Sequence, residues 1–179
     1  MNARKMLVAT ACVLLMNQPL CAEENSAQPM VNTIAPSSET LQILFTPPTG
    51  WRFADRSALP PSIKVMVVGE GKRDFPPSMS LGMEAYSGTL KEMLKTIKSI
   101  NETQGGEWKD LGSIRTEAGD ASLSQLDVKT EWGDIRMMHV VLVKDGNAYI
   151  LTSAALKEEF PQFYKEFFNA MRSLRFEKS

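Results

Sequence analysis

The chain has 179 residues, of which 20 are basic and 21 acidic, so its net charge at neutral pH is −1. Nucleic acids and anionic membrane surfaces need clustered lysine and arginine, and this balance argues against either as the main partner. The length is enough for one substantial core, because a domain near 150 residues buries about two-thirds of its unfolded surface.

The N-terminal segment 1–22 has the pattern of a cleaved export signal. Arg4 and Lys5 precede an apolar run that is too short to span a bilayer, and a short polar stretch then ends at Ala22. We expect cleavage after Ala22 and therefore a periplasmic protein. Two alternatives stay open: a lipid anchor on Cys21, which the large residue before it disfavours, and an uncleaved anchor. Secretion out of the cell is a further alternative location.

The mature chain follows from this cleavage. Both cysteines, Cys12 and Cys21, lie in the removed segment, so no thiol remains for a disulfide, a nucleophile or a zinc site. Two of the 20 basic residues are also removed, which leaves 18 basic and 21 acidic side chains and a net charge of about −3. Residues 23–40 are polar, proline-containing and without periodicity, which predicts a flexible linker before one domain at 41–179.

The first half of the domain alternates short strands with turn-forming segments. Gly50 permits a turn, and Trp51 after it is expected to fold over the core. Thr89 and Glu92 form a capping box that begins a helix with one apolar face. The expected elements are strands at 41–45, 63–68, 79–85, 108–116 and 121–129, and a helix at 89–100.

The second half predicts the centre of the fold. Apolar residues fill both sets of alternate positions in 134–144, as in a strand covered on both faces. Asp145 and Gly146 suit a two-residue hairpin turn before a return strand at 149–153. A helix with Pro161 near its start follows. Its aromatic stripe is expected to be buried and consists of Phe160, Phe163, Tyr164, Phe167, Phe168, Met171 and Leu174.

This order of elements predicts an α+β fold, an α/β/α sandwich with a central antiparallel sheet of about six or seven strands and helices on both faces. Three features resemble the PsbP-like superfamily: Phe45-x-x-Pro-x-Gly-Trp51, the helix after the third strand, and the ending Tyr149-Ile-Leu-Thr152…Phe160…Phe167…Ser173-Leu-Arg. That superfamily includes the extrinsic photosystem II subunit, a nuclear Ran-binding factor and bacterial envelope proteins such as the DcrB lipoprotein. The resemblance implies a protein that binds other macromolecules without a shared active site, and it assigns no partner or binding residue to this chain.

Candidate chemistry is sparse. His139 is the only histidine and lies among apolar residues of its expected strand, with no Gly-x-Ser-x-Gly motif in the chain. Met137 shares its strand face, and a thioether with an imidazole suits Cu(I), although methionine is also an ordinary core residue. Asp127, Glu131 and Asp134 are interpreted as a solvated turn. We expect no catalytic residue, no bound metal and no cofactor.

Two surface features place an aromatic residue beside charge, a composition enriched in protein–protein interfaces. Lys72, Arg73 and Phe75 lie in a connection rich in glycine and proline that is expected to project into solvent. Trp132 lies in the turn before the central strand. These four residues are the candidate partner-binding residues, with the alternative that each aromatic ring folds back onto its own hairpin.

The sequence therefore predicts an exported, non-enzymatic binding or accessory protein of the bacterial cell envelope that acts through contacts with an unknown protein partner. Two alternatives stay open. One is a periplasmic protein that handles copper or binds a small ligand, with Met137 and His139 as its only chemistry. The other is a secreted effector or an effector chaperone.

Overall fold

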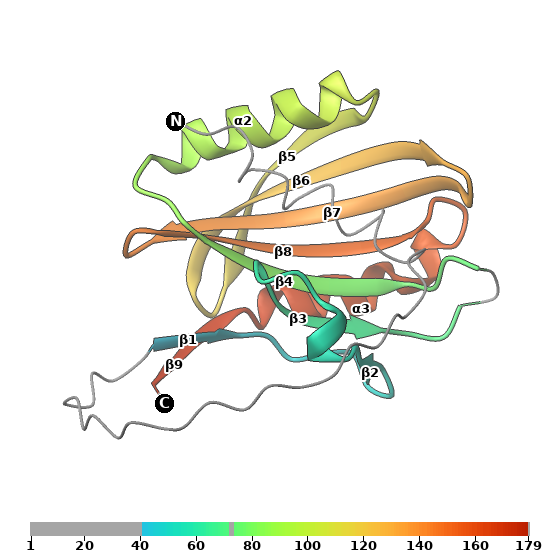
Figure 1. Cartoon of the computed structure of the whole chain (residues 1–179), viewed down its shortest axis with the longest axis horizontal. Coiled ribbons are helices and arrows are strands. Elements are labelled where there is room, and N and C mark those ends of the chain that lie inside the picture. The colour runs from blue at the N-terminus through green and yellow to red at the C-terminus, as the bar shows by residue number, and fades with distance from the viewer. Residues whose placement is uncertain (1–40, 72–73, 179) are drawn as a thin grey trace, which may run out of the picture.

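The computed structural model of the protein describes residues 41–71 and 74–178 (Figure 1). The predicted export signal at 1–22, with Cys21, and the predicted linker at 23–40 lie outside the described residues. No helix in the described ranges is both long and apolar enough to cross a membrane. The elements in chain order are β1 (Leu41–Leu44), β2 (Arg52–Phe53), η3 (Arg56–Ala58), β3 (Ile63–Val68), β4 (Ser78–Ala85), α2 (Leu90–Thr103), β5 (Glu107–Thr116), β6 (Gly119–Thr130), β7 (Gly133–Lys144), β8 (Asn147–Leu156), α3 (Phe160–Arg172) and β9 (Arg175–Lys178).

Seven strands form one antiparallel sheet in the order β2-β3-β4-β8-β7-β6-β5, and β1 pairs with β9 in a second sheet of two strands. The predicted architecture, an antiparallel sheet with a helix on each face, is confirmed. The sequence does not predict β2 or β9, because β2 has only two residues and β9 has one apolar residue among its four, so neither shows an alternating pattern. Because β1 pairs with β9, the strand expected at 41–45 belongs to the small sheet and not to the central one.

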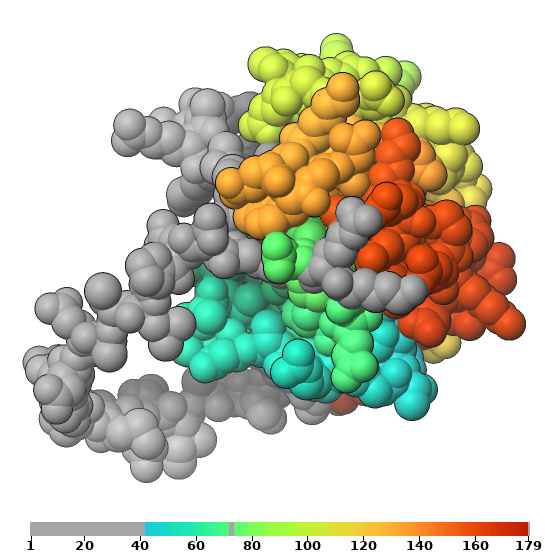
Figure 2. Space-filling view, turned by 90° about the vertical axis from the view of Figure 1, so that its right-hand side faces the viewer, coloured from blue at the N-terminus to red at the C-terminus, as the bar shows by residue number. Residues whose placement is uncertain are grey.

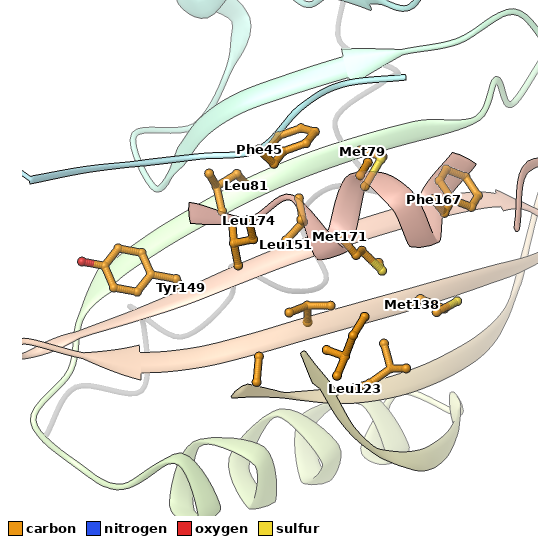
Figure 3. Close-up of a cluster of buried hydrophobic side chains, with 14 of the residues drawn as sticks. Phe45, Met79, Leu81, Leu123, Met138, Tyr149, Leu151, Phe167, Met171 and Leu174 are labelled. Carbon is orange, nitrogen blue, oxygen red and sulfur yellow. The ribbon is translucent and has the colours of Figure 1, made fainter. Parts of the chain in front are cut away.

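Strand β7 is buried on both faces, as its sequence predicts. Met138 and Val140 join the main core, in which α3 contributes Phe167 and Met171 (Figure 3). Val141 points to the opposite face and packs in a separate cluster with residues of α2. One helix on each side therefore covers the centre of the sheet, and this keeps both sets of apolar residues out of water.

The two helices begin as the sequence predicts. Both hydrogen bonds of the capping box at α2 are present, with the Thr89 hydroxyl accepting from the Glu92 N–H and the Glu92 carboxylate accepting from the Thr89 N–H. In α3 most of the predicted aromatic stripe packs inward, and Trp51 contacts it edge-on, with its ring centroid 5.8 Å from that of Phe167. Tyr164 differs from the prediction, because it lies on the flank of the helix and is 49% exposed.

The hairpin between β7 and β8 has the predicted turn. Asp145 and Gly146 have φ angles of 50° and 73°, the left-handed conformation that a primed two-residue turn requires. The turn fixes the register from Lys144↔Asn147 to Ile135↔Leu156, and so decides which side chains of β8 face each helix.

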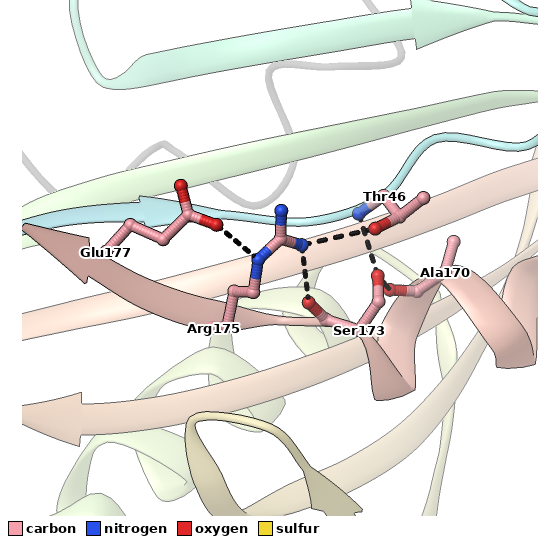
Figure 4. A network of polar contacts seen from close by, with 5 residues as sticks. All are labelled: Thr46, Ala170, Ser173, Arg175 and Glu177. Atoms are coloured by element: carbon pink, nitrogen blue, oxygen red, sulfur yellow. Dashed lines mark hydrogen bonds and ion pairs between the residues drawn. The ribbon is translucent and has the colours of Figure 1, made fainter.

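The small sheet ties the two ends of the domain together (Figure 4). The Ser173 hydroxyl accepts from the Thr46 N–H at 2.7 Å, and the Arg175 guanidinium donates to the Thr46 hydroxyl at 3.1 Å. Arg175 also pairs with Glu177 at 2.6 Å. The segment that leaves α3 is therefore held against the segment that leaves β1.

The capping box leads to a stability prediction. Thr89→Ala removes the acceptor for the Glu92 N–H at the first turn of α2, and we expect it to lower the free energy of unfolding by about 1 kcal/mol. Urea denaturation followed by circular dichroism measures the change. Ser87→Ala, an exposed serine just before the cap, is the matched control and should change stability by less than about 0.5 kcal/mol. Equal effects of the two variants would contradict the role of the cap.

Candidate functional site

His139 lies at the centre of the sheet face that α2 partly covers, and its side chain is 0% exposed. Its Nδ1 lies 3.0 Å from the hydroxyl of Thr152 on β8. The indole of Trp108 on β5 stacks on the imidazole, with ring centroids 5.7 Å apart and an angle of 10° between the planes. Burial lowers the pKa of His139 from 6.5 to about 4, so the imidazole is neutral near pH 7.

A buried polar row crosses four strands at this level. The register places Ser124, His139, Thr152 and Ser80 directly opposite one another on β6, β7, β8 and β4, and each is at most 6% exposed. Among the described residues, the Nε2 of His139 and the Oγ of Ser124 have no hydrogen-bond partner. Sequence patterns miss this row, because its members come from four strands and are adjacent only through register.

The arrangement around His139 is that of a structural residue. A general base must reach a substrate, whereas this imidazole is enclosed by the sheet and by Trp108. Met137 shares its strand face, as the sequence predicts, and is 2% exposed. The described residues contain no group of three or more His, Cys, Asp or Glu side chains that could hold a metal. Met137 and His139 thus belong to the packed interior of the sheet.

The expected solvated turn is wrong for Asp127, whose side chain is only 10% exposed. Its carboxylate accepts two hydrogen bonds from Arg136, at 2.8 and 2.7 Å, and pairs with Lys157 at 2.9 Å. These bonds, those from Arg136 foremost, hold the pKa of Asp127 below its ordinary value. The cluster joins β6 and β7 to the end of β8, and sequence spacing alone cannot reveal it because Lys157 is 30 residues from Asp127 in the chain.

Two of the four candidate partner-binding residues come together at one end of the sheet. The rings of Phe75 and Trp132 are in contact, with centroids 6.0 Å apart, so the β3–β4 connection lies beside the β6–β7 turn (Figure 2). The expectation that Phe75 projects into solvent is wrong, because its side chain is 2% exposed. Trp132 is half-buried. Lys72 and Arg73 lie outside the described residues.

Trp132 borders a hollow of about 360 Å³. The remaining lining residues come from the start of β7, the end of β8 and the connection between β8 and α3, and they are Gly133, Asp134, Leu156, Lys157 and Glu158. A half-buried indole anchored on a buried phenylalanine, with charged groups beside it, combines apolar contact area with polar groups that can fix the orientation of a partner.

Comparison with known proteins gives matches by structure. No family model and no curated protein matches the sequence. LpqN, a protein involved in cell envelope biogenesis of Mycobacterium tuberculosis, is 13% identical with a TM-score of 0.56 over 79% of this chain and 86% of that chain. A Pseudomonas aeruginosa protein of unknown function, PA94, is 15% identical with a TM-score of 0.50 over 79% of this chain and 85% of that chain. Cyanobacterial PsbP from Synechocystis is 15% identical with a TM-score of 0.48 over 85% of this chain and 100% of that chain.

This chain shares its fold with LpqN and PA94. The solved structures of similar fold also include a PsbP protein, the family that the sequence resembles. At identities of 13% and 15% the likeness extends to the fold alone, and none of the three proteins is named as an enzyme. Function has to be argued from the surfaces of this chain.

The pKa of His139 leads to a prediction about acid stability. Its folded pKa of about 4 lies below the ordinary value of 6.5, so protonation of His139 opposes folding. The free energy of unfolding is unaffected above pH 6.5 and declines as the pH falls toward 4. At pH 4 the free energy of unfolding should be lower by about 3 kcal/mol. Urea denaturation between pH 7.5 and 4 should show a steeper decline for the unchanged protein than for His139→Gln. Parallel curves would show that His139 is not the titrating group.

Asp127 leads to a second prediction. Asp127→Asn removes the charge that holds Arg136 and Lys157. We expect it to lower the free energy of unfolding, measured by urea denaturation, by about 2 kcal/mol at pH 7. Because the folded pKa of Asp127 is lowered, this difference should shrink once the pH falls below its ordinary value of 3.8. Asp120→Asn, the same change on the same strand in an ion pair with a 71% exposed carboxylate, is the control and should cost less than about 1 kcal/mol.

Proposed function

We propose that the protein is an exported, non-enzymatic binding or accessory protein of the bacterial cell envelope that acts through protein–protein contacts. The observation that carries this proposal is the end of the sheet around Trp132. There the indole is half-buried on Phe75 and borders the hollow of about 360 Å³. Partly exposed aromatic residues that rest on a rigid base are common anchors of protein interfaces.

The position of His139 supports a role without catalysis. The imidazole is 0% exposed, stacked under Trp108 and bonded to Thr152, so a substrate cannot reach it without opening the sheet face. The charged groups beside Trp132 are Asp134 at the start of β7 and Lys157 and Glu158 in the β8–α3 connection. The Lys157 ammonium is already paired with the Asp127 carboxylate.

The envelope location rests on two independent lines of support. The segment 1–22 has the pattern of an export signal. LpqN, which shares the fold with a TM-score of 0.56, is involved in cell envelope biogenesis. We propose a periplasmic protein that is released from its signal, and a lipid on Cys21 would instead hold it at a membrane of the envelope.

A quantitative pull-down tests the proposal. The mature chain 23–179 is crosslinked in envelope extract of its own bacterium, beside a variant carrying Trp132→Ala, Lys72→Ser and Arg73→Ser. Phe75 is kept because it is buried. A partner that uses this surface should be recovered at least tenfold less with the variant, because truncating an aromatic anchor costs about 2 kcal/mol or more.

The matched control for this experiment carries Lys91→Ser and Lys95→Ser, which remove the same charge from the exposed side of α2. It should recover the partner as the unchanged chain does. If every recovered protein is retained equally by the two variants, the Trp132 surface is not the binding surface. If no protein is recovered with any of the three chains, the binding role itself is wrong.

A further inference from the structure

Helix α3 crosses one face of the sheet diagonally. It leaves one corner of that face uncovered. At its start, the Arg136 guanidinium of β7 lies 6.0 Å from the ring of Phe160. At its end, the carbonyl of Arg172 accepts from the N–H of Glu117, in the turn between β5 and β6. The helix therefore runs from the end of β8 to the far end of β5. The corner that it leaves is formed by the first half of β5 and the neighbouring part of β6.

The helix flank that faces this corner carries a stack of side chains one turn apart. The rings of Tyr164 and Phe168 are 5.3 Å apart, and the guanidinium of Arg172 lies 5.1 Å over the ring of Phe168. The opposite flank, with Glu166 and Asn169, lines a separate hollow against the Thr46–Thr49 segment. Because residues four apart share one side of a helix, the stack lies on the side away from that segment. Figure 2 shows α3 in red beside the yellow of β5.

The strand side of the corner is an edge with a bulge. The register shifts between Asp110 and Gly112, and the intervening Leu111 is 37% exposed. Lys109 lies opposite Gln125, which is itself opposite Met138 of the main core, so Lys109 is on the α3 side of the sheet. Of the three exposed large apolar side chains in the described ranges, two, Leu111 and Tyr164, belong to this region.

The charge of the region is opposite to that of the chain. The first half of β5, the neighbouring part of β6 and the facing flank of α3 contribute three basic side chains and two carboxylates, which are Lys109, Lys165, Arg172, Glu107 and Asp127. Arg136 of β7 and Lys157 of the β8–α3 connection lie beside them. Asp127 already holds Arg136 and Lys157. Lys109, Lys165 and Arg172 form no ion pair with a described carboxylate, whereas the chain as a whole has a net charge of −1. Asp110 lies opposite Ser124, on the other face of the sheet.

We propose that this α3–β5 corner, made of Lys109, Leu111, Gln125, Tyr164, Phe168 and Arg172, docks an acidic segment of a partner protein. An extended segment can follow the flank of α3 from Lys109, near the start of β5, to Arg172, beside the end of β5. An apolar side chain of that segment contacts Tyr164 and Leu111, and carboxylates toward its two ends pair with Lys109 and Arg172. Stacking on Phe168 holds the Arg172 guanidinium in place before binding, which reduces the entropy lost when a carboxylate is bound. The corner is a second surface, separate from the Trp132 hollow, and the inference rests on the proposed protein-binding function.

A protein segment fits this chemistry better than a nucleic acid. A phosphate backbone is bound by lysine and arginine side chains clustered along several nucleotides, whereas this corner offers three basic side chains that are not already paired with a described carboxylate. The apolar content, a tyrosine ring and a leucine side chain, matches the core of a small protein interface whose charged groups form the rim.

Site-specific crosslinking in living cells tests the proposal. A photoreactive phenylalanine analogue replaces Leu111 or Tyr164 in the full chain, and Lys95 on the exposed side of α2 serves as the control position. After irradiation, the crosslinked peptides are identified by mass spectrometry. The expected product from both corner positions is one protein segment with at least two carboxylates beside an apolar residue. The control position should not give this segment.

Charge reversal adds the decisive comparison. Lys109→Glu with Arg172→Glu should lower the yield of that crosslink at least tenfold, because both ion pairs become repulsive. Lys91→Glu with Lys95→Glu, which changes the net charge equally on α2, should leave the yield unchanged. Circular dichroism and urea denaturation confirm that each variant is folded.

Four outcomes would overturn the inference: a crosslinked segment without carboxylates, a crosslink to nucleic acid, a yield that does not respond to charge reversal, or no crosslink above the control position. The proposed function is tested separately by the pull-down at the Trp132 surface. If the pull-down succeeds and the corner gives no crosslink, the binding role stands and the corner is not its surface. If both fail, the proposed function fails with it.

Discussion

The rest of the structure depends on the burial of both faces of the β7–β8 hairpin. Met138 and Met137, neighbours in the chain, enter separate cores on opposite sides of the sheet, and neither can be exposed without a large loss of apolar burial. The sheet must therefore be covered twice. Helix α3 and the β1–β9 pair cover one side, while α2, Trp108 and the Phe75–Trp132 contact cover the other. The candidate surfaces are the places where these covers end.

Local chemistry made most of the fold predictable. The capping box at Thr89, the Asp145–Gly146 turn and the double apolar pattern of β7 each involve residues within a few positions of one another, and each is present as predicted. Non-local contacts account for the differences. Phe75 is buried because a turn nearly 60 residues later brings Trp132 against it, and Tyr164 is exposed because α3 crosses the sheet at an angle. Neither relation is present in a short window of sequence.

The buried and the accessible polar groups of the described residues lie in different places. The residue with the most catalytic potential by type, His139, lies in a row of buried polar groups that register alone assembles, whereas the aromatic and charged groups that remain accessible lie on connections, on a helix flank and at a strand edge. The two edges of the large sheet are poor templates for strand addition, since β2 has two residues and β5 is bulged and charged. The proposed recognition would therefore use side chains and not strand addition.

The pairing of β1 with β9 has a mechanical consequence. Leu41 is directly opposite Lys178, so the chain enters and leaves the domain at one point, near the β7–β8 hairpin, where the Lys144 ammonium lies 4.3 Å from the Phe176 ring. In Figure 1 this point lies at the lower left, away from the turn between β6 and β7 at the right. A force that pulls Leu41 away from Lys178 would peel the β1–β9 hydrogen bonds one at a time instead of shearing them together. The seven-stranded sheet would bear little of that load until the small sheet had opened.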